Sequence, residues 1–126
     1  MIADGIIPLG NKAWPNAPAY QYVYTPGGDQ FTDLCLGIAA GSIARNGTPV
    51  SLQPCGVTAV TIWLTLATGP SVVYSPLING TNELDGNPYV LTAVGPARQL
   101  ITHRLVVVSG KGPAGSQLWR DLYGAL

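Results

Sequence analysis

The chain has 126 residues, enough for one domain with a modest core. Only 10% of its residues are charged, far below the roughly 25% usual in soluble domains, and six basic residues balance six acidic ones. Without a positive field that gathers phosphate groups, we expect neither nucleic acid nor an anionic membrane surface as a partner. No apolar stretch approaches the length needed to cross a bilayer, so we expect no membrane insertion.

Residues 1–19 are predicted to form an extended N-terminal arm. Three prolines lie between Gly5 and Ala19, and apolar and polar residues hardly alternate, which suits an extended backbone better than a ladder. Such a segment can lie over its own domain. It can also dock on another protein by adding a strand or filling a groove. In that second case four side chains would make the contact: Ile6, Ile7, Leu9 and Trp14.

Residues 20–126 are predicted to form a single all-β domain. Short runs rich in β-branched and aromatic residues alternate with Gly, Pro and Asn turn signals. The candidate strands, in chain order, are Tyr20–Tyr24, Leu34–Ala39, Pro49–Leu52, Ile62–Leu66, Ser71–Tyr74, Tyr89–Ala93, Gln99–Ile101, Leu105–Val108 and Leu118–Leu122. This spacing is typical of a sandwich or barrel. Ala114–Tyr123 could instead close with a helical turn capped by Ser116.

The chain has two cysteines, Cys35 and Cys55, 20 residues apart. A disulfide between them would stabilise the fold by about 3 kcal/mol in the chain-entropy model. The alternative is two buried free thiols. Few charges, 16 glycines and 11 prolines beside a paired cysteine favour an extracellular protein. Because Met1–Asp4 shows no signal-peptide pattern, we expect the mature form of a secreted protein.

An internal repeat is the first hypothesis for the architecture. Two windows have nearly the same arrangement of apolar residues before a tryptophan: Leu36 precedes Trp63 by 27 residues, and Leu91 precedes Trp119 by 28. In a small barrel each repeat must send a large apolar residue inward. We therefore expect Trp63 and Trp119 to plug the core, with Leu36, Leu52, Leu91 and Leu105 beside them.

The stretch Tyr22–Leu66 resembles one repeat of the ricin-type β-trefoil lectins. It has a cysteine-leucine start at Cys35, a Gly-Thr-Pro-Val turn at Gly47–Val50, a Pro-Cys at Cys55 and a closing tryptophan. Residues 88–123 look like a second, more divergent repeat, in which Gln117-Leu118-Trp119 matches the family's Gln-x-Trp signature. The resemblance implies a β-trefoil-like closed barrel, and it places Cys35 and Cys55 where those repeats often carry an internal disulfide. A trefoil has three repeats, of which two align here.

The sugar pocket of that family is largely missing. Its aspartate position is Gly37 in the first repeat and Thr92 in the second, and its stacking position before Pro54 is Gln53. Without a charged acceptor and a flat apolar face, the first repeat is not expected to bind sugar. The second retains Gln117, whose hydrogen bond can be structural. A lectin remains an alternative, with Tyr89, Thr92 and Gln117 in a rearranged site.

No catalytic constellation is evident in the sequence. His103 is the only histidine, it is expected at a solvent-facing strand edge, and no nucleophile, metal or cofactor pattern accompanies it. We therefore expect no enzyme, no metal and no cofactor. The leading hypothesis is a secreted, non-catalytic module that binds another secreted protein, as an adaptor subunit of an extracellular assembly that could be toxin-like. Besides the lectin, a trefoil protease inhibitor that presents the loop Pro76–Asn87 is the further alternative.

Overall fold

The computed structural model describes residues 17–28, 32–56, 58–65, 74–84, 86–96, 98–108 and 112–120. Over these ranges the chain is all-β, as predicted, and its helical elements are short 3-10 turns: η2 (Pro26–Gly28), η3 (Ala59–Thr61) and η4 (Gly115–Gln117). None of the helices found in these ranges is long and apolar enough to cross a membrane.

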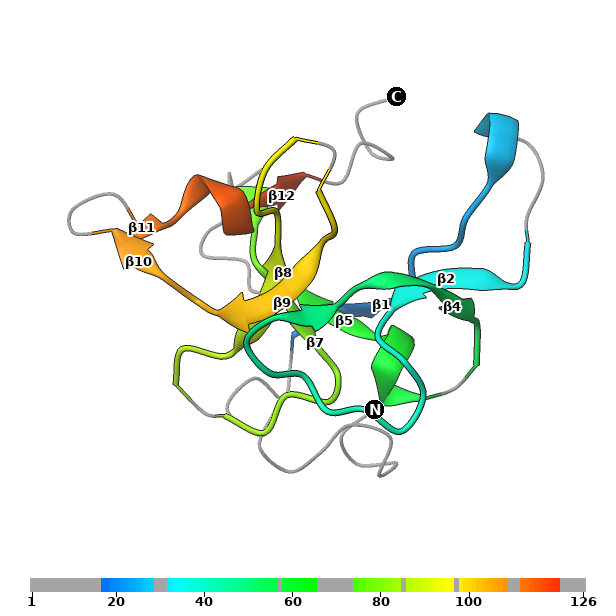
Figure 1. Ribbon diagram of the computed structural model, residues 1–126, viewed down its shortest axis with the longest axis horizontal. Coiled ribbons are helices and arrows are strands. Elements are labelled where there is room, and N and C mark those ends of the chain that lie inside the picture. The colour runs from blue at the N-terminus through cyan, green and yellow to red at the C-terminus, as the bar shows by residue number, and fades with distance from the viewer. Residues whose placement is uncertain are drawn as a thin grey trace.

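The strands are short and most are paired in antiparallel ladders (Figure 1). They are β1 (Ala19–Tyr20), β2 (Leu34–Gly37), β3 (Thr48–Pro49), β4 (Ser51–Pro54), β5 (Trp63–Thr65), β6 (Tyr74–Ser75), β7 (Leu77–Asn79), β8 (Tyr89–Thr92), β9 (Ile101–Arg104), β10 (Val107–Val108), β11 (Gly112–Pro113) and β12 (Trp119–Arg120). Six of them form one sheet in the order β1-β5-β7-β8-β9-β3. Three further pairs are β2 with β4, β6 with β12, and β10 with β11. The described strands do not close the large sheet into a barrel, because its end strands β1 and β3 do not pair.

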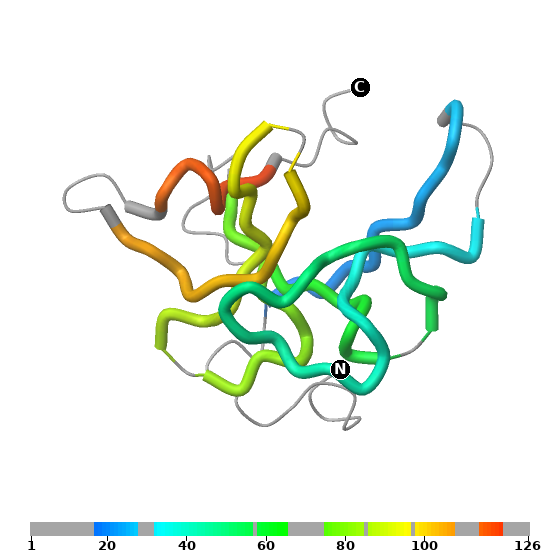
Figure 2. The backbone as a smooth tube through the Cα atoms, in the orientation of Figure 1, coloured from blue at the N-terminus to red at the C-terminus, as the bar shows by residue number. Residues whose placement is uncertain are grey.

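The chain contains two structural repeats, residues 19–65 (repeat 1) and 74–120 (repeat 2), which lie side by side in Figure 2. Each begins with a strand that pairs with its own tryptophan strand: Tyr20 faces Trp63, and Ser75 faces Trp119. Each continues with a hairpin in the same register, β2 with β4 and β8 with β9. The ladder contact of Val23 with Cys35 in repeat 1 likewise returns as Ile78 with Val90 in repeat 2.

The tryptophan that ends each repeat is held in the same way. The Trp63 indole N–H donates to the Leu36 carbonyl at 2.9 Å, and the Trp119 indole N–H donates to the Leu91 carbonyl at 2.8 Å. A 3-10 turn precedes each tryptophan and bonds to the residue two positions after the leucine. In repeat 1 the Ile38 N–H donates to the Val60 carbonyl of η3, and in repeat 2 the Ala93 N–H donates to the Ser116 carbonyl of η4. The internal repeat inferred from the two tryptophans is therefore present in the structure.

The largest buried cluster surrounds Trp63, which is fully buried, and includes Leu77 and Leu91. Trp119 packs against this cluster but is only partly buried. Leu36 is likewise partly buried, and Leu105 belongs to a second cluster with Ile62, Leu64, Ile78 and Val90. The expectation that Leu52 lies in the core is wrong, because 45% of it is exposed.

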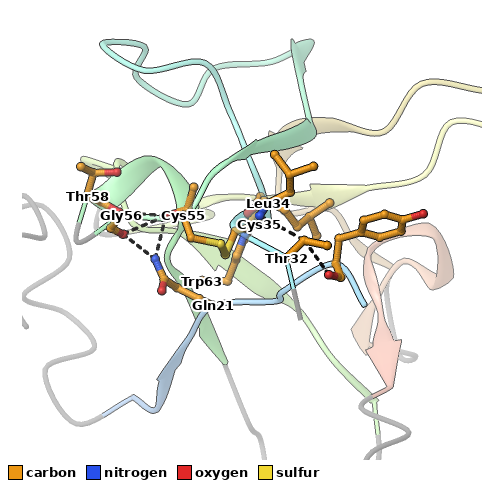
Figure 3. The surroundings of a disulfide bond; sticks show 11 residues. Gln21, Thr32, Leu34, Cys35, Cys55, Gly56, Thr58 and Trp63 are labelled. Atoms are coloured by element: carbon orange, nitrogen blue, oxygen red, sulfur yellow. Dashed lines mark hydrogen bonds between the residues drawn. A yellow bond between two sulfur atoms is a disulfide. The ribbon is translucent and has the colours of Figure 1, made fainter. Parts of the chain in front are cut away.

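The disulfide between Cys35 and Cys55 is confirmed (Figure 3). It joins β2 to the residue that follows β4, across a Cα–Cα distance of 5.1 Å. In the matching register of repeat 2 the two positions are Val90 and Leu105, which share the second buried cluster. The disulfide of repeat 1 thus stands where repeat 2 has an apolar pair.

The segment after β6 differs most from the sequence expectation. Residues 75–82 are buried, and β7 lies where an exposed loop from Pro76 to Asn87 was expected. The buried Asn79 amide donates to the Val60 carbonyl at 3.2 Å and accepts from the Thr81 N–H at 3.0 Å, so its polar groups are satisfied without solvent. A Cβ on Gly80 would lie 2.6 Å from the Ala59 carbonyl oxygen, so glycine permits this close approach.

Residues 17–19, which the sequence assigned to the N-terminal arm, contact the β-domain. Ala17 and Ala19 pack against the second cluster, Ala19 pairs with Leu64 in β1, and the Pro18 carbonyl accepts from the Thr65 N–H at 2.9 Å. Residues 17–19 therefore belong to the domain. The four proposed contact residues Ile6, Ile7, Leu9 and Trp14 lie outside the described residues.

Removing the disulfide tests its contribution to stability. Changing both Cys35 and Cys55 to alanine should lower the free energy of unfolding by about 3 kcal/mol, because the open loop gains entropy in the unfolded chain. Urea denaturation with and without reductant measures the loss. The double variant should not respond to reductant, and a wild-type protein equally indifferent to reductant would contradict the prediction.

The two tryptophans should differ in their contribution to stability. Trp63→Ala should cost about 3–5 kcal/mol, because the whole ring is buried. Trp119→Ala should cost less, because part of its ring is already in water. Chemical denaturation of both variants measures the difference, and a loss at Trp119 as large as that at Trp63 would show that the two rings are equally buried.

Candidate binding surface

Gln117, the polar residue proposed for a rearranged sugar site, is 1% exposed. Its side-chain oxygen accepts from the Val106 N–H at 2.7 Å, and its amide donates to the Thr92 hydroxyl at 3.1 Å and to the Arg104 carbonyl at 2.9 Å. These bonds hold the turn η4 against the β8–β9 hairpin. The structure thus brings Gln117 and Thr92 together, but their hydrogen-bonding groups serve the fold.

The third residue of that proposed site, Tyr89, is half-buried at the start of β8 and packs against the Trp63 cluster. Thr92 is buried, and its hydroxyl donates to the Val90 carbonyl at 3.0 Å. Two of the three residues therefore have no polar group turned to solvent. What the arrangement offers a sugar is the exposed part of one aromatic ring.

Repeat 1 uses a different glutamine for the corresponding role. The Gln21 amide donates to the Gly56 carbonyl at 2.6 Å and to the Thr61 hydroxyl at 2.9 Å, which ties the turn η3 to the end of the β2–β4 hairpin (Figure 3). Thr61 occupies the position of Gln117, two residues before the tryptophan. Its side chain is shorter than that of Gln117, and Gln21 completes the connection between η3 and the hairpin. Sequence reasoning missed Gln21, because it lies far from the turn along the chain.

The ionisable side chains that the structure describes do not converge on one site. His103 is half-buried on β9, opposite Val90 of β8 and beyond the two residues that pair with β3, and its Nδ1 lies 2.8 Å from the Arg104 carbonyl oxygen. The Arg104 guanidinium donates to the carbonyls of Asn87 and Gly86, at 2.6 and 3.2 Å. Over the described ranges, no group of three His, Cys, Asp or Glu residues is placed to hold a metal ion.

Repeat 1 carries an apolar surface, which we call the repeat 1 face. It consists of Tyr20, Tyr24, Leu34 and Leu52, which are 48%, 43%, 38% and 45% exposed, together with the partly buried Tyr22 and Leu36. The strand register places these residues on one side of a ribbon formed by residues 20–24, β2 and β4. Tyr24 lies opposite Leu34, and Leu36 lies opposite Leu52. The face is continuous with the core, because Tyr22 and Leu36 pack against the Trp63 cluster.

The same face in repeat 2 is covered. Of the six corresponding residues, Ser75, Leu77, Asn79, Leu91 and Thr102 are buried, and Tyr89, at the position of Leu34, is half-buried. Repeat 1 covers this face, because its Trp63 packs in one cluster with Leu77 and Leu91, and the Thr102 hydroxyl donates to the Arg45 carbonyl at 2.6 Å. The strand edges also meet, since β5 pairs with β7 and β3 pairs with β9. The covered face is thus partly polar, whereas the uncovered face of repeat 1 carries tyrosines and leucines. Contact with water favours polar side chains on the exposed face and apolar ones on the covered face, and the two repeats show the opposite distribution.

The sequence alone does not reveal this surface. Leu52 aligns with Thr102 and Tyr24 with Asn79 when the repeats are superposed by register, and only the structure shows which member of each pair is covered. Apolar periodicity alone assigned Leu52 to the core.

Compared with known proteins, the chain matches no family model, no curated protein and no solved structure. The resemblance to the ricin-type lectins therefore stays a prediction.

A stability measurement distinguishes the structural role of Gln117 from a role in sugar binding. Gln117→Ala should lower the free energy of unfolding by about 1–3 kcal/mol, because it leaves buried partners without a hydrogen bond. Gln53→Ala is the control: that glutamine bonds only Ser51 at the exposed surface and should change stability by about 0.5 kcal/mol or less. Unchanged stability together with lost binding on a glycan array would instead support the lectin alternative.

Proposed function

We propose that the protein is a secreted, non-catalytic module that binds another protein through the repeat 1 face. It would act as an adaptor or subunit of an extracellular assembly, for example a toxin-like assembly. The observation that carries the proposal is the exposure of Tyr20, Tyr24, Leu34 and Leu52 together on one side of one ribbon. Apolar surfaces of this kind, rich in tyrosine and poor in charge, are typical of protein interfaces.

Two features support the extracellular setting. The Cys35–Cys55 disulfide is of the kind that persists in oxidising compartments. The small number of charged residues is the second, since such chains with many glycines and prolines are common among secreted domains. We further propose a trefoil-like arrangement for the domain, and the two repeats with matching tryptophans support it.

The two alternatives have less support. For a lectin, the polar groups of Gln117 and Thr92 would have to leave their partners within the fold. For a protease inhibitor, the loop Pro76–Asn87 would have to enter a protease cleft, but residues 76–82 are buried. Glu83, Gly86 and Asn87 are the residues of this segment that the structure places at the exposed surface, with Leu84 half-buried.

Affinity capture with matched variants tests the proposal. The wild-type protein and the variants Leu52→Asp and Val107→Asp are immobilised and exposed to the extracellular fluid of the source, and the captured proteins are identified by mass spectrometry. Leu52 belongs to the repeat 1 face, whereas Val107 is equally apolar, 59% exposed, and lies on the separate β10–β11 hairpin. A specific partner should be retained by the wild type and by Val107→Asp, and lost by Leu52→Asp.

Capture of the same set by all three proteins would rule out the repeat 1 face as the binding surface. Binding to a glycan array that survives Leu52→Asp and is lost when Tyr89 is changed to alanine would favour the lectin instead.

A further inference from the structure

The contact between the two repeats is directional. Repeat 1 contributes its tryptophan strand β5 and its short strand β3, and repeat 2 contributes β7 and β9. The surfaces that meet are therefore different parts of the repeat unit. In such a heterologous contact each repeat uses one of two complementary surfaces. Repeat 1 therefore keeps the surface that repeat 2 uses, and repeat 2 keeps the surface that repeat 1 uses.

The unused half on repeat 1 is the repeat 1 face, with the strand edge at Val23. Val23 and Ile78 are equivalent, and each faces a residue of its own hairpin. Ile78 also pairs with Leu64 of repeat 1 and is fully buried, whereas Val23 has no such partner strand in the described part of the chain and is 38% exposed. On the hairpin side of Val23 the backbone hydrogen bonds involve its neighbours: the Tyr24 N–H donates to the Leu34 carbonyl, and the Tyr22 carbonyl accepts from the Leu36 N–H. Its own N–H and carbonyl therefore point to the open edge.

Repeat 1 covers repeat 2 with its strand β5 and nearby core residues. The unused half on repeat 2 consists of the counterparts of these residues, which are β12, Leu100 and Ala93. Trp119 is partly buried where Trp63 is fully buried, Leu100 is partly buried where Val50 is 2% exposed, and Ala93 is partly buried where Ile38 is 0% exposed. Figure 1 shows β2 and β4 on one side of the central strands and β12 on the other, so the two halves do not cover each other within one chain.

We propose that the partner on the repeat 1 face is a second copy of this chain, bound head to tail, with β12 of one copy running along Val23 and Tyr24 of the next as β5 runs along β7. This inference rests on the proposed function, because it names the occupant of the same surface. Both halves of the contact are present on the chain, and their mode of contact is the one already seen between repeats 1 and 2. The balance of six basic and six acidic residues leaves no net repulsion between copies.

The register of the contact follows from the equivalence of the repeats. Leu64 follows Trp63 and pairs with Ile78, so Arg120, which follows Trp119, is expected opposite Val23 of the neighbouring copy. Directly opposed residues of antiparallel strands have Cα atoms within the range that a disulfide spans. A cysteine at each of these positions, on separate chains, should therefore form a cross-link.

Sedimentation velocity from micromolar to millimolar protein tests the association. The wild type and Val107→Asp should rise with concentration from the 13.1 kDa monomer to at least twice that mass, and Tyr24→Asp should stay monomeric. Tryptophan fluorescence confirms that the variants are folded, and substitution of an exposed tyrosine should leave it unchanged. A wild type that is monomeric throughout, or a Tyr24→Asp variant that associates as the wild type does, would overturn the inference.

Cross-linking tests the register. Val23→Cys mixed with Arg120→Cys under mild oxidation should give a mixed dimer, whereas Val23→Cys mixed with Val107→Cys should give at least tenfold less. Equal yields would overturn the head-to-tail geometry. A monomeric wild type that still captures a different protein through Leu52 would overturn the second copy as occupant and leave the proposed function standing. Self-association with no other protein captured would support the second copy and remove the adaptor role.

Discussion

The indole N–H of each closing tryptophan donates to a leucine carbonyl in the first hairpin strand of the same repeat, β2 or β8, and the rest of the structure depends on this bond. It brings together two segments that are 27 residues apart in repeat 1 and 28 apart in repeat 2. Because a buried indole without an acceptor is costly, the bond and the burial of the ring require each other. The hairpin between them is thereby folded back over the tryptophan strand, which creates the inner side of each repeat.

Around this constraint the two repeats satisfy the same geometry with different chemistry. A disulfide in repeat 1 stands where repeat 2 has the apolar contact of Val90 with Leu105. Gln117 anchors its turn in repeat 2, whereas Gln21, from a distant strand, reaches the corresponding turn in repeat 1. Gly37 stands at the position of Thr92, and a Cβ there would lie 2.6 Å from the Val60 carbonyl oxygen, so the turn of repeat 1 sits closer to its strand. These exchanges explain why the repeats share a fold with so few identical residues.

Much of the local structure could be predicted from the sequence, because it depends on local patterns. The β-rich runs, the cysteine pair and the spacing of Trp63 and Trp119 produced correct expectations about the all-β class, the disulfide and the repeat. Several strand bounds differ, since β9 covers Ile101–Arg104 where the sequence suggested a break. The fate of Leu52 and Asn79 could not be predicted in this way. Leu52 has the apolar character of a core residue and Asn79 that of a turn, but their burial is decided by whether another repeat covers them. The strand β7 and the role of Gln21 could not be predicted for the same reason, because both depend on contacts between residues far apart in the sequence.

The directional packing of the repeats also explains why the repeat 1 face is apolar rather than polar. Repeat 2 could accept Asn79 and Thr102 on its inner side, because repeat 1 supplies their hydrogen-bond partners at Val60 and Arg45. Repeat 1 has tyrosines and leucines at the matching positions, which suit a partner that approaches as a packed strand and excludes water.

Hydrogen exchange of the indole N–H groups, followed by NMR, tests most directly whether the two tryptophans close their repeats in the same way. The account predicts that the indole protons of Trp63 and Trp119 both exchange slowly, with Trp63 the slower because its ring is fully buried. A Trp119 indole proton that exchanges as fast as one in an unfolded peptide would contradict it.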